Sequence, residues 1–169
     1  MLAKPLAALA TLAVAAGTAA VANGAPAPAQ KITPLRVGGV HIGDRHRTLR
    51  ARGLVGPIGP GCGLAPDTRS ARLKAPLKGL VNYTQSRPRL VTNILVTGGA
   101  KARDVGIGAR PRAIRKAFPK ARFDHTTESV FGITRVKVPR NGGGRLQFAV
   151  STDTHRVTLI GVPFIAFCE

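Results

Sequence analysis

Basic side chains recur at short intervals in two stretches of this chain. Residues 40–54 read VHIGDRHRTLRARGL, and residues 105–119 read VGIGARPRAIRKAFP. Clustered arginines and lysines attract anions and can form charge-assisted hydrogen bonds to phosphate or carboxylate groups. We therefore expect any anion- or partner-binding site to use the basic residues of these stretches, which are Arg45, Arg47, Arg50 and Arg52, and Arg110, Arg112, Arg115 and Lys116.

The glycines of both stretches resemble a phosphate-binding loop, because the start of a helix after a glycine turn can bind anions. Neither stretch contains the Walker pattern, and Arg47 and Arg112 stand where a dinucleotide fingerprint has its last glycine. We expect these glycines to form tight turns before the helices, and anion binding by the glycine turns is the alternative.

Catalytic and metal-binding patterns are missing from the sequence. Its histidines, His41, His46, His125 and His155, do not have metal-ligand spacing, and no Gly-x-Ser-x-Gly elbow occurs. We predict a non-enzymatic protein with no metal and no cofactor. The alternative is a small secreted enzyme whose site, at the junction of the duplicated segments, would join His41 and Asp44 to arginine side chains. A purely structural secreted protein is a third interpretation.

The chain carries 26 Lys and Arg against 7 Asp and Glu, a formal net charge of +19. A protein this basic should adhere to polyanions. We expect an acidic protein or a cell-envelope polyanion as partner, although the composition bias of a GC-rich genome explains the charge equally well. Nucleic acid is disfavoured, because the protein is predicted to be exported and has few aromatic residues for base stacking.

The N-terminus predicts export. Lys4 precedes an apolar run from Leu6 to Ala22, which ends in the small-x-small pattern Ala20-Val21-Ala22. We predict a cleaved signal peptide at 1–22, an Ala/Pro-rich linker at 23–34 and one secreted domain at 35–169, either extracellular or in a bacterial cell envelope. An uncleaved membrane anchor is the alternative. After cleavage we expect no membrane span, and we expect a monomer.

The two cysteines, Cys62 and Cys168, both fall in the exported part. Two thiols in an oxidising compartment usually pair. The predicted disulfide would close a loop of about 100 residues, which the chain-entropy model values at about 4–5 kcal/mol. Two buried free thiols are the alternative.

The two basic stretches align at a fixed offset that places Gly43 over Gly108. The segments behind them, 79–96 and 146–162, also align, and each reads as a β-hairpin. Each stretch predicts a helix of about two turns. Asp44 is the expected N-cap of the first, with Gly53 ending it, and Pro111 lies in the first turn of the second.

Further strands are expected at 130–138, 145–151 and 156–162, with a hairpin loop at 141–144. The predicted fold class is therefore α+β. Two tandem repeats, at about 38–97 and 103–163, would each contain a short helix and an antiparallel β-meander, with the helices packed on one face of the sheet.

A glycine–aliphatic helix start followed by a β-meander, repeated in tandem over residues 38–162, resembles the superfamily of β-lactamase-inhibitor proteins and outer-membrane-assembly (SmpA/OmlA) lipoproteins. The resemblance implies binding of proteins or scaffolding of envelope complexes, without catalytic residues. This chain departs from the inhibitor pattern in having few aromatic residues, so a β-lactamase target is not implied.

Overall fold

The computed structural model describes residues 29–62, 67–139 and 145–167. The predicted signal peptide, the first half of the predicted linker, the loop 141–144 and Cys168 lie outside the described residues. Cys62 is described but Cys168 is not, so the pairing of the two cysteines stays a prediction. The first strand, β1 (Gln30–Thr33), begins inside the stretch that we expected to be linker.

The larger sheet has eight strands in the order β10-β11-β12-β13-β7-β6-β5-β4. All of its neighbours pair antiparallel, and β13 and β7 meet at its centre. Its strands are β4 (Gly59–Pro60), β5 (Arg69–Arg72), β6 (Lys78–Tyr83), β7 (Val91–Gly98), β10 (Arg122–Asp124), β11 (Ile133–Val138), β12 (Leu146–Ser151) and β13 (Val157–Val162).

The smaller sheet has five short strands in the order β3-β2-β1-β8-β9. Its central pair, β1 and β8, is parallel, and the remaining pairs are antiparallel. The strands besides β1 are β2 (Arg36–Val37), β3 (Val40–His41), β8 (Ala100–Ala102) and β9 (Val105–Gly106).

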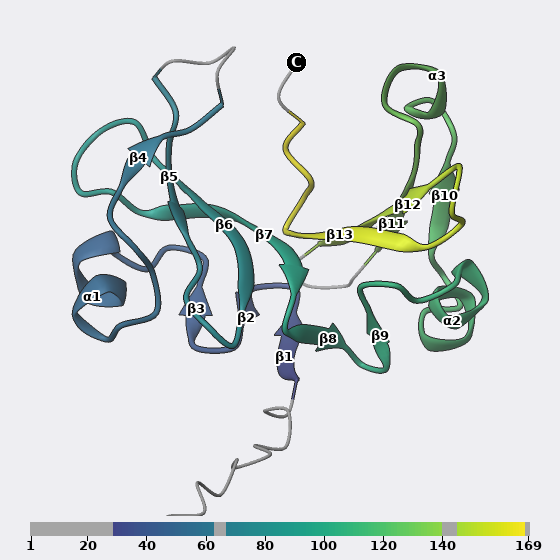
Figure 1. Cartoon of the computed structure of the whole chain (residues 1–169), viewed down its shortest axis with the longest axis horizontal. Coiled ribbons are helices and arrows are strands. Elements are labelled where there is room, and N and C mark those ends of the chain that lie inside the picture. The colour runs from purple at the N-terminus through teal and green to yellow at the C-terminus, as the bar shows by residue number, and fades with distance from the viewer. Residues whose placement is uncertain (1–28, 63–66, 140–144, 168–169) are drawn as a thin grey trace, which may run out of the picture.

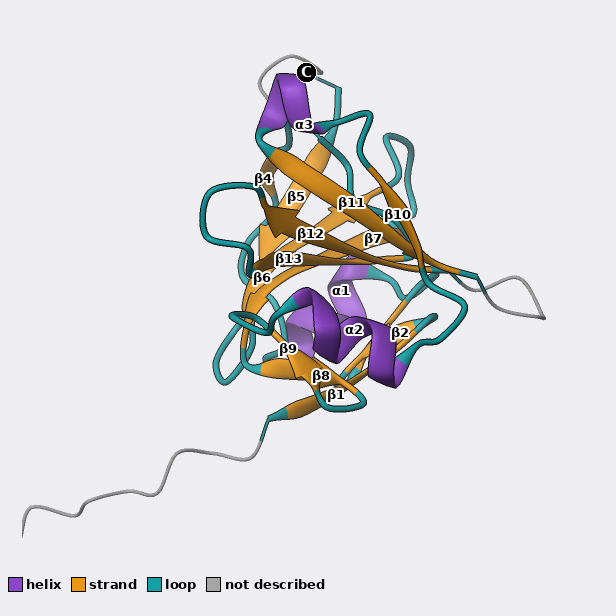
Figure 2. Cartoon of the chain, turned by 90° about the vertical axis from the view of Figure 1, so that its right-hand side faces the viewer, coloured by secondary structure: helices purple, strands orange, loops and turns teal. Residues whose placement is uncertain are grey.

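One apolar core lies between the larger sheet on one side and the smaller sheet with two helices on the other (Figures 1 and 2). The helices are α1 (His46–Ala51) and α2 (Pro111–Ala117), which contribute the fully buried Leu49 and Ile114. Helices this short are marginal alone, so burial of these side chains holds them in place.

The predicted α+β class, with helix-plus-meander repeats and helices on one face of a sheet, is wrong. About 45% of the described residues lie in strands and 13% in three helices, and the strands form two sheets. The third helix, α3 (Glu128–Phe131), was not predicted. The smaller sheet was not predicted, because strands of two to four residues are too short to show a recognisable alternation of apolar and polar residues.

Several local predictions are confirmed. Helices form behind both glycine turns, and Gly43 and Gly108 adopt φ of +88° and +82°, which only glycine adopts easily. The Gly43 N–H donates to the Val91 carbonyl at 2.8 Å, and the Gly108 N–H donates to the Val157 carbonyl at 2.8 Å. Both copies of the duplicated stretch are therefore fastened to the larger sheet in the same way, at the first residues of β7 and β13.

The predicted N-cap of the first helix is wrong. Arg45 occupies the N-cap position of α1 without a side-chain cap. The Asp44 carboxylate instead accepts a hydrogen bond from the His41 N–H at 2.8 Å. The turn between β3 and α1 therefore uses this carboxylate, and the helix begins one residue later than expected.

No helix of the described residues is long and apolar enough to cross a bilayer.

Candidate functional site

The first predicted cluster surrounds α1. Leu49 is fully buried and holds the helix against the core, so the polar side of the helix faces solvent. All four predicted basic residues are exposed, and the first turn contains no acidic residue. These residues are Arg45, Arg47, Arg50 and Arg52.

The second predicted cluster surrounds α2, which Ile114 anchors in the same manner. The Arg115 guanidinium lies 3.9 Å from the centroid of the Phe123 ring, a cation–π arrangement that orders the side chain while leaving it exposed. The whole cluster, Arg110, Arg112, Arg115 and Lys116, is exposed.

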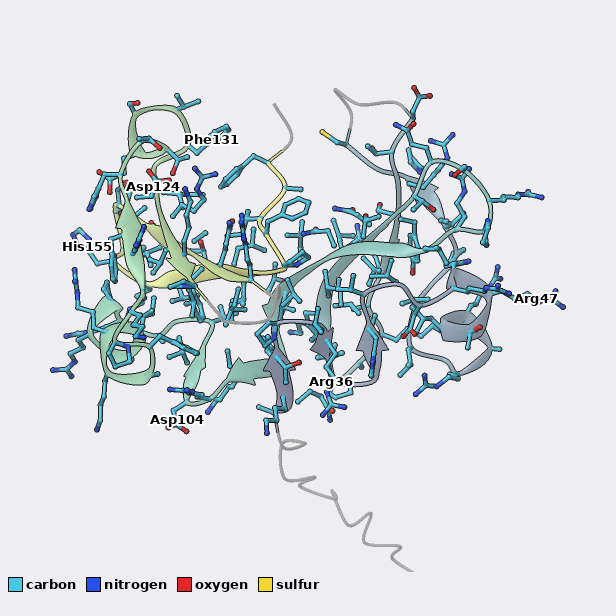
Figure 3. The ribbon with its side chains drawn as sticks, turned by 180° about the vertical axis from the view of Figure 1, so that it is seen from behind. Arg36, Arg47, Asp104, Asp124, Phe131 and His155 are labelled. Carbon is cyan, nitrogen blue, oxygen red and sulfur yellow. The ribbon has the colours of Figure 1, made fainter. Side chains whose placement is uncertain are left out.

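The structure does not bring the two clusters together. Helices α1 and α2 lie at opposite ends of the longest axis, with the strands of the smaller sheet between them (Figure 1). Figure 3 shows Arg47 at one extreme end of the molecule. A compact anion site formed by both clusters is therefore excluded by the fold.

Sequence reasoning missed a third group of cations, on the outer face of the smaller sheet. Lys31 and Lys101 are paired neighbours on β1 and β8, and Arg36 extends outward from β2. Their neighbours along the strands, such as Ile32 and Val37, are buried, so these cations all lie on the outer face. We call Lys31, Arg36 and Lys101 the basic strip. Arg36 also pairs with His41 of β3.

The basic strip has no ion pair among the described residues. The described ion pairs join Asp124 to Arg135 and Lys137, at 2.8 and 2.7 Å, and His125 to Glu128. All lie around β10, β11 and α3, far from the underside that carries Arg36 (Figure 3). Like charges on paired neighbours destabilise a sheet, so Lys31 beside Lys101 costs stability unless an anion compensates.

One exposed carboxylate lies near the strip. Asp104 belongs to the turn between β8 and β9, and Figure 3 shows it on the same underside as Arg36. The Arg103 beside it donates to the Ala117 carbonyl and stacks over Phe118, 4.9 Å from the ring centroid. Arg103 thereby connects this turn to the end of α2.

The carboxylates on the other side of the molecule are strongly stabilised as anions. Hydrogen bonds from Lys137, Thr126 and Arg135 hold the pKa of Asp124 well below its usual range. Hydrogen bonds from Thr134 and His125 lower the pKa of Glu128. At this end of the larger sheet, Arg135 and Lys137 are therefore paired with a carboxylate.

The described residues also include a buried phenol and several cavities. Burial raises the pKa of Tyr83, and the Asp44 carboxylate raises it further, so the phenol stays protonated. Cavities of 330–490 Å³ occur in the described part of the chain, and neither His41 nor Asp44 lines these cavities. Among these residues no group of three or more His, Cys, Asp or Glu could hold a metal ion.

The strip could not have been found by scanning the sequence for clusters. Lys31 and Lys101 are 70 positions apart and meet only through the parallel pairing of β1 and β8. The one available signal was single basic residues beside aliphatic ones, as in Lys31-Ile32 and Arg36-Val37. That signal is too short to separate a strand from a loop.

Comparison of this chain with protein-family models, with curated proteins and with solved structures finds no match.

Proposed function

We propose that this protein is a secreted, non-enzymatic binding module for a polyanion of the cell envelope. The observation that carries the proposal is the basic strip, in which Lys31 and Lys101 are paired neighbours and form no ion pair with a described carboxylate. Such an arrangement is unfavourable by itself and becomes favourable when an anion lies across it.

The shape of this surface suits a polymer better than a small ligand. Lys31 borders a cavity of about 330 Å³, but Arg36 and Lys101 line none of the described cavities, whereas small-molecule sites are usually concave and largely apolar. Phosphates or carboxylates spaced along a chain could each meet one cation. Affinity for such a polymer is expected to fall steeply with salt, because binding releases condensed counterions.

Inorganic polyphosphate is a suitable probe, and its affinity can be measured by calorimetry at several salt concentrations. A variant with Lys31→Gln, Arg36→Gln and Lys101→Gln removes the strip. A control variant with Arg72→Gln, Arg87→Gln and Lys137→Gln lowers the net charge equally, at exposed positions of the larger sheet and its β6–β7 loop.

The strip variant should bind at least ten-fold more weakly than the native chain, with a log–log salt slope shallower by about 2, since each lost contact removes about 0.7. The control variant should bind within about three-fold of the native chain. Equal losses in both variants would mean that net charge alone, rather than this surface, holds the polymer. Absence of binding by the native chain would overturn the proposal.

A further inference from the structure

We infer that the basic strip and both helix clusters form one continuous anion-binding track, which holds a single extended polyanion along the length of the molecule. This inference rests on the proposed function and specifies its ligand as a linear polymer. The underside presents its elements in the order α1, β3, β2, β1, β8, β9, α2 (Figure 1). Exposed cations are found on α1, β2, β1, β8 and α2, and at the β8–β9 turn.

Contacts at both ends join the strip to the helix clusters. At one end, the Arg52 guanidinium packs over Gly39 in the turn between β2 and β3, where a Cβ on the glycine would come within 3.4 Å of it. At the other end, Arg103 of the β8–β9 turn donates to the Ala117 carbonyl at the end of α2. Each helix therefore abuts one hairpin of the smaller sheet, and a basic side chain bridges each junction.

The dimensions of these elements set the length of the track. Five strands spaced about 4.8 Å apart span about 19 Å, and a helix about 10 Å in diameter at each end extends the total to about 40 Å. A polymer shorter than about 20 Å can meet the strip or one helix cluster. Only a polymer of about 40 Å can meet all three groups at once.

Asp104 is the feature of this underside that opposes the track, because its exposed carboxylate follows Arg103. A polyanion that crosses from the strip to α2 must pass near this charge. The Asp104→Asn variant should therefore bind long polymers about two- to four-fold more tightly, which is the gain expected from removing one nearby like charge in water. An increase in affinity is a result that loss of folding cannot imitate.

The test uses polyphosphates of increasing chain length, with extended lengths of about 10, 20, 40 and 80 Å. These lengths are a quarter, a half, one and two times the track length of about 40 Å. Affinity should rise steeply with length up to about 40 Å and then increase little. The α1 variant Arg47→Gln with Arg50→Gln should weaken binding of 40 Å chains at least three-fold, and that of 10 Å chains less than two-fold. The α2 variant Arg112→Gln with Lys116→Gln should behave in the same way.

The outcomes separate the track from the proposed function. If affinity stops rising at about 20 Å, or if the helix variants affect short and long chains equally, the three groups act as independent sites and the track is wrong, while polyanion binding itself stands. If no polyphosphate binds the native chain, the proposed function fails and the track fails with it. Tighter binding of acidic proteins than of any polyphosphate would also overturn the polymer assignment.

Discussion

The Lys101→Gln substitution should make the protein more stable and, at the same time, a weaker polyanion binder. Lys101 is paired with Lys31 across β1 and β8. Side chains of paired residues begin about 5 Å apart. Two positive charges at that separation repel each other by about 0.8 kcal/mol in water, and physiological salt roughly halves this value.

Removal of one charge should therefore raise the free energy of unfolding by about 0.4–0.8 kcal/mol. For a domain of this size, that gain corresponds to an increase of about 1–3 °C in Tm. The same change removes one phosphate contact. Release of about 0.7 counterion at 0.15 M salt contributes about 0.8 kcal/mol to binding, so polyphosphate affinity should fall about four-fold.

Differential scanning calorimetry at low and high salt measures the first effect, and titration with polyphosphate measures the second. The gain in Tm should shrink as salt rises, because screening weakens the repulsion. Lys137→Gln is the matched control. Lys137 pairs with Asp124 at 2.7 Å, so its loss should not raise Tm. A Lys101→Gln protein that is less stable than the native chain at low salt would refute the reasoning about like charges on the strip.

Three further predictions concern the fold. Leu49→Ala and Ile114→Ala truncate fully buried side chains, so each should lower the free energy of unfolding by about 2–5 kcal/mol, measured by chemical denaturation. A loss below 1 kcal/mol would show that these contacts do not hold the short helices in place. Tyr83→Phe should leave Tm unchanged or raise it, because the buried Tyr83 hydroxyl has no hydrogen-bond partner among the described residues; a marked loss in Tm would reveal one. Lys137, Thr126 and Arg135 lower the pKa of Asp124, so the Asp124 carboxylate stabilises the fold above about pH 4. This contribution is lost as the pH falls through the lowered pKa that Asp124 has in the folded protein. Asp124→Asn should therefore reduce stability at pH 7, with a difference that narrows below about pH 4; a constant difference across this range would contradict the assignment.

The sequence was sufficient to place the two helices behind the glycine turns and the strands of the hairpin β12–β13, but not α3. Glycine turns at Gly43 and Gly108, with apolar residues at helical spacing behind them, predicted α1 and α2, and alternating residues predicted β12 and β13. These signals are local, because turn chemistry and side-chain periodicity act within a few residues.

The class of the fold was not predictable in the same way. The smaller sheet is built from strands of two to four residues, whose pairing depends on contacts between segments far apart in the chain. The sequence identified both helix clusters as candidate binding residues but could not show that the fold separates them to opposite ends of the molecule. The candidate surface depends on the pairing of Lys31 with Lys101, two residues that are far apart in the chain, so the sequence alone does not predict it.

Polyanion binding by the basic strip is tested most sharply by the salt dependence of polyphosphate binding, compared between the strip variant (Lys31, Arg36 and Lys101 to Gln) and its charge-matched control. For a polymer about 40 Å long, the log–log slope of the strip variant should be shallower by about 2, and the control should retain the native slope. Identical slopes in the two variants would mean that the polymer responds to net charge and not to the underside of the smaller sheet.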